Sequence, residues 1–172
     1  MSDEGAAAKP ARPPFSISPR LAIVLAFVLG ALTVAGYAPF HLYLQPVITV
    51  AGLCYLWHSA RTPRAAAATG YAFGLGWFLF GVSWVYVSMH DFGGMPAPLA
   101  AVATLLFCAF LALFPAAVGY ASGRWDAAPV ARYGLLVPAT WVLAEWTRGW
   151  IFTGFPWLAL GYSQIPESPL AG

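Results

Sequence analysis

Residues 65–89 read, in one-letter code, AAAATGYAFGLGWFLFGVSWVYVSM. None of these side chains is charged. A helix needs about 20 predominantly apolar residues to cross a hydrocarbon core of about 30 Å, so the stretch predicts a membrane-spanning helix. Gly70, Gly74 and Gly81 recur on one face of that helix, and this small-residue stripe predicts close packing against a neighbouring helix.

The composition of the whole chain places it in the same class. Hydrophobic residues make up 60% of the 172 positions, and charged residues make up 8%. A soluble domain carries about 25% charged residues, and a chain of this length has no interior large enough to hide so much apolar surface. The chain is therefore expected to be an integral membrane protein. Its net charge of +2 is too small to indicate a nucleic-acid partner.

Four further apolar segments are expected to cross the membrane. They cover residues 21–37, 42–58, 97–122 and 133–150. The fold class that follows is all-α, a polytopic transmembrane helix bundle of about five spans. Residues 1–20 are expected to form a disordered tail, and residues 151–172 a segment outside the bilayer.

The first apolar segment follows basic residues and invites comparison with a secretory signal peptide. Its apolar run is longer than the 7–15 residues usual for the core of such a signal, and further spans follow it. We interpret residues 21–37 as an uncleaved first helix.

The basic residues orient the predicted bundle. Seven of the eight fall on one side, namely Lys9, Arg12, Arg20, Arg61, Arg64, Arg124 and Arg132. Arg148 alone falls on the other side. Because cytoplasmic loops carry the excess of Lys and Arg, the N-terminus is predicted to be cytoplasmic. The opposite face then holds residues 37–41, 90–98 and 145–164.

The most informative polar cluster lies on that opposite face, where residues 145–157 read EWTRGWIFTGFPW. Glu145 and Arg148 stand three residues apart, so on a helix they share a face and can pair. One interpretation is a structural ion pair flanked by interfacial tryptophans. The other is a site for lipid head groups, in which Arg148 contacts a phosphate and Phe155 and Trp157 line a slot for acyl chains.

The remaining candidates are weaker. His90 and Asp91 open the segment HDFGGMP at residues 90–96, which is expected to be a shaped loop whose glycines permit tight turns. Cys54 and Cys108 both lie in predicted spans, where a thiolate is disfavoured, and are expected to be packing residues. No residues have the spacing of a metal site, so no metal is predicted.

With these segments in place, the chain resembles the N-terminal membrane region of bacterial apolipoprotein N-acyltransferases. The matching segments are GYAPF at 36–40, GVSWVYVS at 81–88, HDFGGMP at 90–96 and EWTRGWIFTGFPWLALGYSQ at 145–164. Their order, and their shared side of the predicted membrane, make the match specific.

The resemblance implies an activity that composition alone does not. Enzymes of this family transfer an acyl chain from a membrane phospholipid, typically phosphatidylethanolamine, to the N-terminal amine of a diacylglyceryl-cysteine lipoprotein. The reaction passes through a thioester acyl-enzyme and uses no cofactor. The family's site faces the periplasm at the bacterial inner membrane, which agrees with the face selected by the charges.

The resemblance also has a limit. The family's Glu-Lys-Cys triad lies in a nitrilase-like α/β domain that follows eight spans, and neither cysteine of this chain lies in a matching context. No catalytic residue is therefore assigned, and the 172 residues alone are expected to be inactive. They are expected to anchor the enzyme and to dock lipid or lipoprotein through Glu145, Arg148, Phe155 and Trp157, with His90 and Asp91 as further candidates.

Two other classes remain open on the residues alone. A small multispan transporter or channel subunit would place polar groups near the bilayer midplane, and the central parts of residues 65–89 and 97–122 carry no charge. A membrane anchor without chemistry of its own is the other. Substrate flux in sealed vesicles distinguishes the transporter, and lipoprotein N-acylation distinguishes the enzyme.

Overall fold

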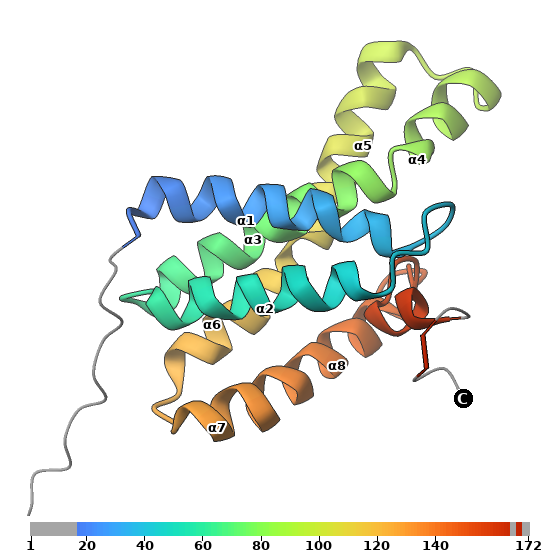
Figure 1. Cartoon of the computed structure of the whole chain (residues 1–172). Helices are drawn as coiled ribbons and strands as arrows, with labels where there is room; N and C mark the ends of the chain where they lie inside the picture. Colours follow the sequence, from blue (N-terminus) through green and yellow to red (C-terminus); the bar gives the residue numbers. More distant parts are fainter. Residues whose placement is uncertain (1–16, 166–167, 170–172) are drawn as a thin grey trace, which may run out of the picture.

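The computed structural model describes residues 17–165 and 168–169, and every regular element within them is helical (Figure 1). The longer helices are α1 (Pro19–Thr33), α2 (Leu44–Ser59), α3 (Pro63–Gly81), α5 (Ala97–Leu111), α6 (Leu113–Arg124) and α8 (Val137–Arg148). The short elements are η1 (Val34–Gly36), α4 (Trp84–Val87), η2 (Ser88–Phe92), α7 (Pro129–Ala131), η3 (Arg132–Leu136) and η4 (Leu160–Gln164). The predicted all-α class is confirmed for this part of the chain.

Two helices begin at a hydroxyl residue followed by proline. The Ser18 hydroxyl accepts a hydrogen bond from the backbone N–H of Leu21, and the Thr62 hydroxyl accepts one from that of Ala65. The proline that follows each cap is the first helical residue, where its missing N–H costs nothing. Such caps contribute about 1 kcal/mol each, and they fix where α1 and α3 start.

The centre of the bundle is α3, which packs chiefly against α1 and α6. Glycines allow the backbones to approach closely. A Cβ atom at Gly70 would collide with the backbone carbonyl of Pro115 in α6, and one at Gly76 would collide with that of Phe27 in α1. The predicted glycine stripe is confirmed at Gly70, which faces Pro115 of α6, and at Gly74, which faces Ala112 just before α6. Gly81 instead accommodates the side chain of Leu158.

Large aromatic side chains fill the space beneath these contacts. Trp77 is 1% exposed and stacks on Phe78 with ring centroids 5.2 Å apart. Trp141 of α8 approaches Trp77 at 6.1 Å and Phe73 at 6.5 Å. This aromatic core joins α8 to α3.

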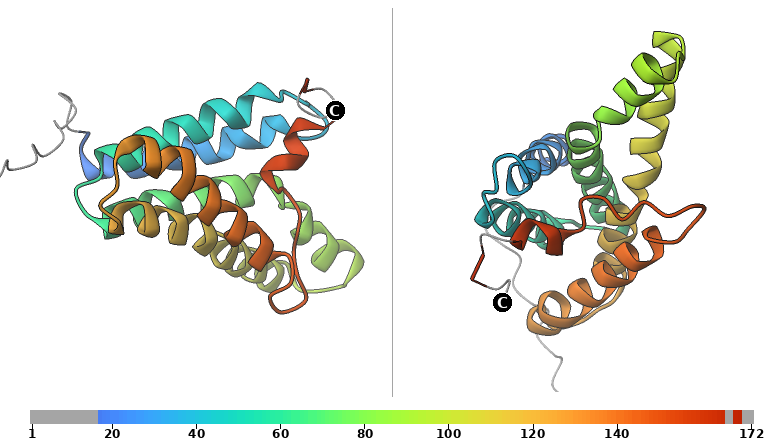
Figure 2. Two further views of the ribbon diagram at one scale, coloured as in Figure 1. Left: turned by 90° about the horizontal axis from the view of Figure 1, so that it is seen from below. Right: turned by 90° about the vertical axis from the view of Figure 1, so that its right-hand side faces the viewer.

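Two predicted spans are interrupted in the structure. Residues 65–89 were expected to form one helix, but α3 ends at Gly81, and the helix that resumes at Trp84 is bent by 50°. The break between α5 and α6 falls at Ala112, three residues before Pro115. Proline has no N–H to donate to the carbonyl one turn earlier, which weakens the helix at that point. As Figure 2 shows, α4, η2 and the first part of α5 therefore form an arm that projects from the bundle.

Helices occupy all five stretches that were expected to span the membrane, but they do not establish five spans. Pro19–Gly36 and Ala97–Arg124 are long and apolar enough to cross a bilayer, and the bent pair of α3 with Trp84–Phe92 makes a third if it counts as one span. At 16 residues, α2 falls short of the usual length of about 20. The number of spans therefore stays a prediction.

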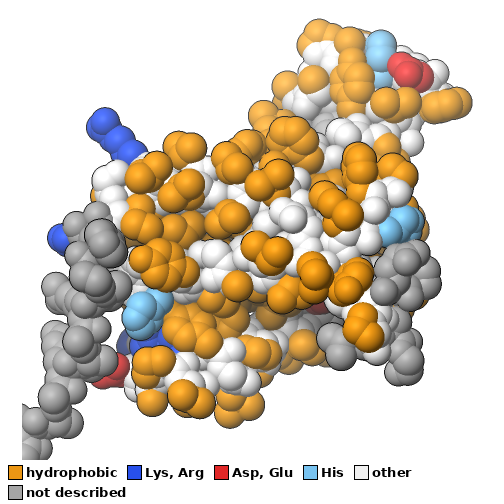
Figure 3. Space-filling model, viewed as in Figure 1, with side chains coloured by type: hydrophobic (Ala, Val, Ile, Leu, Met, Phe, Trp, Pro, Cys, Tyr) orange, Lys and Arg blue, Asp and Glu red, His pale blue; other side chains and the backbone are white. Residues whose placement is uncertain are grey.

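The charges separate along the bundle as the sequence predicts. The described arginines other than Arg148 lie at or beside the start of α1, the start of α3, the end of α6 and the start of η3. These helix ends meet at one end of the bundle, and Figure 3 shows the basic side chains there. Lys9 and Arg12 lie outside the described residues. Arg148 ends α8 at the other end of the bundle.

Candidate functional site

The candidate site is built on residues 149–165, which we call the aromatic loop. It leaves the end of α8, turns back across that end of the bundle and closes with η4 near the α1–α2 connection (Figures 1 and 2). Gly154 has a φ of 76° and supplies the tightest turn, which ordinary side chains adopt only with strain. The loop therefore brings residues 155–160 back against α8.

Arg148 fastens the loop to the end of α8. Its Nη1 donates hydrogen bonds to the backbone carbonyl oxygens of Phe155, at 3.1 Å, and of Trp157, at 2.5 Å. The guanidinium carbon lies 5.2 Å from the centroid of the Phe78 ring, in cation–π range. The residue is only 2% exposed, so its charge is stabilised by carbonyl oxygens and an aromatic face in place of water.

Glu145 holds the same loop through a different group. Its Oε1 accepts hydrogen bonds from the indole N–H of Trp141, at 3.0 Å, and from the backbone N–H of Leu160, at 2.9 Å. Within residues 17–165, its carboxylate makes no ion pair with Arg148 closer than 4.0 Å. In place of the expected direct pair, Glu145 and Arg148 each bind separate backbone groups of the loop.

Two more side chains hold the loop in place, and neither was predicted from the sequence as a site residue. The Tyr37 hydroxyl lies within hydrogen-bond distance of the carbonyl oxygens of Leu158, at 3.2 Å, and Ala159, at 3.3 Å. The Gln164 amide donates to the carbonyl of Tyr43 at 3.0 Å. Both residues occur in the segments that carry the family resemblance, and this was the available signal. Their partners lie more than 100 residues away in sequence, and nothing in the sequence indicates these contacts.

The aromatic side chains of the loop meet the arm. Phe155 packs edge-on against Phe107 of α5, with centroids 4.8 Å apart, and Trp157 lies 6.5 Å from Trp84 of α4. The predicted pair of Phe155 and Trp157 is thus brought together with Phe107 in the second half of α5 and Trp84 at the base of the arm. The four rings form a wall between the loop and the arm, which we call the aromatic wall.

Two loop residues other than glycine adopt a strained backbone. Phe152 has a φ of 57° and Leu158 a φ of 58°, both in the left-handed region. Each such residue costs on the order of 1 kcal/mol or more and persists only where its surroundings impose it. Phe152 is nevertheless 85% exposed. Its ring lies at the surface of the loop, with its centroid 5.5 Å from that of Phe110.

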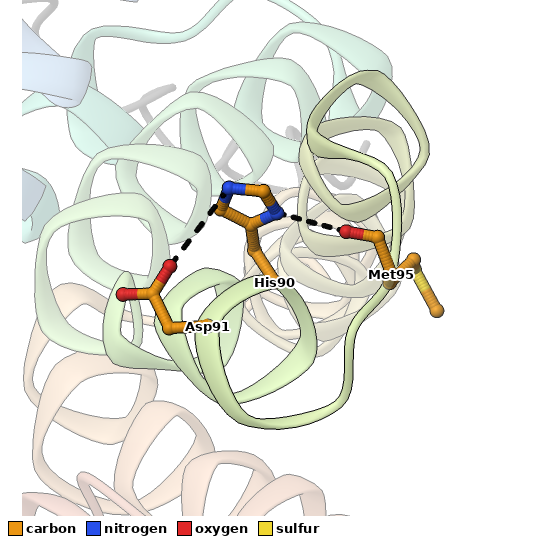
Figure 4. Close-up of polar contacts among 3 residues, drawn as sticks. All are labelled: His90, Asp91 and Met95. Carbon is orange, nitrogen blue, oxygen red and sulfur yellow. Dashed lines mark hydrogen bonds and ion pairs between the residues drawn. The ribbon is translucent and has the colours of Figure 1, made fainter.

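His90 and Asp91 lie elsewhere, in η2 of the projecting arm. Figure 4 shows the His90 ring between the Asp91 carboxylate and the backbone carbonyl of Met95. Its Nδ1 lies 2.8 Å from the Met95 oxygen, and its Nε2 lies 3.9 Å from Asp91 Oδ1. A carbonyl oxygen only accepts, so Nδ1 carries a proton. The structure does not join this pair to Glu145 or Arg148.

The buried polar cluster has no room for a substrate. The cavity bounded by Trp77, Trp141, Glu145 and Arg148 measures about 10 Å³, which is space for about one water molecule. A substrate therefore does not fit inside this cluster. Among residues 17–165 and 168–169, no three His, Cys, Asp or Glu side chains are grouped as metal ligands would be. Glu167 lies outside the described residues.

Comparisons with known proteins show which family this chain matches. Residues 29–172 match the family model described as "Apolipoprotein N-acyltransferase N-terminal domain". An apolipoprotein N-acyltransferase of Nitrosomonas europaea is 55% identical over 151 residues, which cover 87% of this chain and 30% of that protein. One of Chromobacterium violaceum is 44% identical over 170 residues, which cover 98% of this chain and 33% of that protein. The chain thus spans about a third of the length of these relatives.

Proposed function

The chain belongs to the apolipoprotein N-acyltransferase family, and on that premise we propose that it is the membrane platform of such an enzyme. In this role it anchors the enzyme and docks the lipid portions of the substrates. The donor is a membrane phospholipid, with phosphatidylethanolamine as the expected species, and the acceptor is a diacylglyceryl lipoprotein. The platform lies in the bacterial inner membrane, with its N-terminus cytoplasmic and the aromatic loop on the periplasmic side.

The observation that carries this proposal is the way the aromatic loop is held. Glu145 and Arg148 are both committed to the loop backbone, by contacts of 2.9 Å to Leu160 and 3.1 Å to Phe155. Placing a charged residue at the edge of a membrane is energetically unfavourable. Here both charged residues hold in place a loop that carries aromatic rings. Such a fixed wall suits apolar acyl chains because they gain from contact area and need no polar partner.

This assignment modifies the role of Arg148. The residue was a candidate for direct contact with a phosphate, but it is buried, and one terminal nitrogen already binds two carbonyl oxygens. We propose that Arg148 and Glu145 are positioning residues for the wall. Direct contact with lipid then falls to Phe155, Trp157 and the exposed Phe152.

His90 and Asp91 have a separate part in the proposal. Their side chains are 39% and 56% exposed, and 3.9 Å separates His90 Nε2 from Asp91 Oδ1. An exposed carboxylate beside an imidazole ring complements a zwitterionic head group, with the ammonium at Asp91 and the phosphate beside His90. The arm would thus meet the head group while the aromatic wall meets the chains.

We assign no covalent step to these residues. Cys108 is buried and Cys54 half-buried, both within apolar helices. A cysteine nucleophile requires its thiolate, which such surroundings disfavour. The 172 residues are therefore expected to show no N-acyltransferase activity by themselves, and the acyl-enzyme chemistry of the family is expected outside them.

Photo-crosslinking tests the docking role. Benzoylphenylalanine in place of Phe152, which is 85% exposed, is expected to capture a diacylglyceryl lipopeptide in nanodiscs. The control replaces Val130, which is 86% exposed at the opposite end of the bundle. Capture at position 152 well above capture at position 130 supports the proposal. Equal capture at both positions contradicts it, and flux through sealed vesicles would then favour the transporter alternative.

A further inference from the structure

A second candidate site for lipid lies away from the aromatic loop, along α1 and α3. It is an open groove of about 640 Å³ between the first halves of α1 and α3. Ile23, Val24 and Phe27 line it from α1, and Tyr71 and Leu75 line it from α3. The lining is almost wholly apolar, and the volume falls within the range of sites that hold small molecules.

The groove continues into a more polar hollow at the start of the two helices. This hollow measures about 370 Å³ and shares Ile23 and Ala68 with the groove. Ser18, Ser59 and Arg61 line its outer end. The two spaces therefore adjoin at Ile23 and Ala68, the apolar one along the helices and the polar one at the edge of the bundle, and together we call them the channel.

Arg61 is the group in this channel that is available to a ligand. It is exposed, and within the described part of the chain its guanidinium makes no hydrogen bond or ion pair. The Ser59 hydroxyl, by contrast, already donates to the carbonyl of Tyr55 at 3.0 Å. An arginine with five free donors is well suited to bind a phosphate.

The surrounding charge favours an anion. Five described arginines lie at this end of the bundle, and the one described acidic residue there is Asp126. An excess of arginine is also what marks a cytoplasmic membrane edge, where anionic lipids accumulate.

We propose that this channel binds an anionic phospholipid of the cytoplasmic leaflet. Its phosphate lies at Arg61, and one acyl chain follows Ile23, Phe27 and Leu75 along α1 and α3. The site is separate from the aromatic wall and serves neither the donor nor the acceptor of the proposed reaction. It goes beyond the proposed function, with which it shares the orientation of the bundle in the membrane.

The selectivity for anionic lipid tests the head-group contact. The full chain is placed in nanodiscs of phosphatidylcholine with graded phosphatidylglycerol, and bound lipid is measured by native mass spectrometry. Arg61→Gln is expected to lower the preference for phosphatidylglycerol by about fivefold, the effect of one arginine near a membrane surface. The matched control is Arg124→Gln, an exposed arginine at the same end that does not line the channel. Equal losses in both variants, or no loss in Arg61→Gln, would overturn the proposal.

The occupant of the apolar part is identified by a second experiment, which does not depend on Arg61. Benzoylphenylalanine in place of Val24, which lines the groove and is 58% exposed, is expected to capture one phospholipid molecule. Capture of a second copy of the chain, or of residues 1–16 of the same chain, would assign the groove to protein and overturn the proposal. Ala68→Trp, which fills the junction of the two spaces, is expected to abolish the lipid adduct.

Discussion

The aromatic loop and the tip of the arm carry similar residues but use them in opposite ways. Both present charged and aromatic side chains on the face that the sequence singles out. In the loop the charges are turned inward, with Arg148 2% exposed and bonded to carbonyl oxygens. On the arm His90 and Asp91 remain exposed, 3.9 Å apart. A buried charge fixes the backbone, whereas an exposed charge stays available to a ligand.

The contrast extends to the backbone. The loop contains Phe152 and Leu158 with positive φ, whereas the arm places only Gly94 in that region, with a φ of 65°. Glycine adopts this conformation without strain. The strained backbone of the loop therefore depends on the hydrogen bonds of Arg148 and Glu145. The arm has no comparable strain to be held. This difference predicts which substitutions destabilise the fold and which leave it unchanged.

Removing the Arg148 side chain is expected to cause the largest loss of stability. Arg148→Ala leaves the carbonyls of Phe155 and Trp157 without their donor, and we expect a loss of about 3 kcal/mol in the free energy of unfolding. Denaturant titration in detergent micelles measures it. Arg124→Ala, an exposed arginine at the other end, is the control and is expected to change stability by less than about 0.5 kcal/mol. Equal losses would show that Arg148 does not fasten the loop.

A single methyl group at the turn of the loop is expected to have the next largest effect. Gly154→Ala forces alanine to a φ of 76° and drives its Cβ into the carbonyl of Gly149. We expect a loss of about 2 kcal/mol. Gly161→Ala is the matched control in the same loop, because a Cβ there meets nothing within 4 Å. Similar stability of the two variants would mean that the turn is not constrained.

The carboxylate of Glu145 is expected to contribute less. Glu145→Gln keeps the shape and one oxygen acceptor but loses the charge that strengthens the bonds from Trp141 and Leu160. We expect a loss of about 1 kcal/mol and faster hydrogen exchange at the Leu160 amide. Hydrogen exchange resolved to that amide checks it. Unchanged exchange at Leu160 would show that Glu145 does not hold the loop.

The smallest effect is expected at the tip of the arm. Asp91→Asn removes one partner of an exposed, weak pair, so stability is expected to stay within about 0.5 kcal/mol of the parent. The same denaturant titration measures it. A loss as large as that of Glu145→Gln would mean that the arm is fastened as the loop is, and the contrast between the two regions would fail.

Local signals in the sequence predicted much of the fold. The long uncharged run of residues 65–89 indicated a helix, and Gly70 and Gly74 within it indicated close packing. These features act over a few residues or along one helix face, so they can be read without knowledge of the tertiary structure. The bend after Gly81 was not predicted, because an apolar run continues through it.

The site was predicted less completely. The sequence indicated Glu145, Arg148, Phe155 and Trp157 as one cluster, and the structure brings them together. The spacing suggested a direct pair of Glu145 with Arg148, because residues three apart share a helix face. The backbone groups of the returning loop compete for both side chains, and the path of that loop depends on distant partners such as Tyr37. Spacing along one helix contains no information about such contacts.

Lipoprotein N-acylation by a chimera most directly tests whether the fixed loop serves the family's reaction. In the chimera, residues 29–172 replace the matched region of the Nitrosomonas europaea relative. We expect the chimera to acylate a diacylglyceryl lipoprotein, and Trp157→Ala to lower kcat/KM about tenfold while the protein remains folded. Val130→Ala, at the other end of the bundle, is expected to leave the rate unchanged. Full activity in a folded Trp157→Ala chimera would contradict the role assigned to the loop.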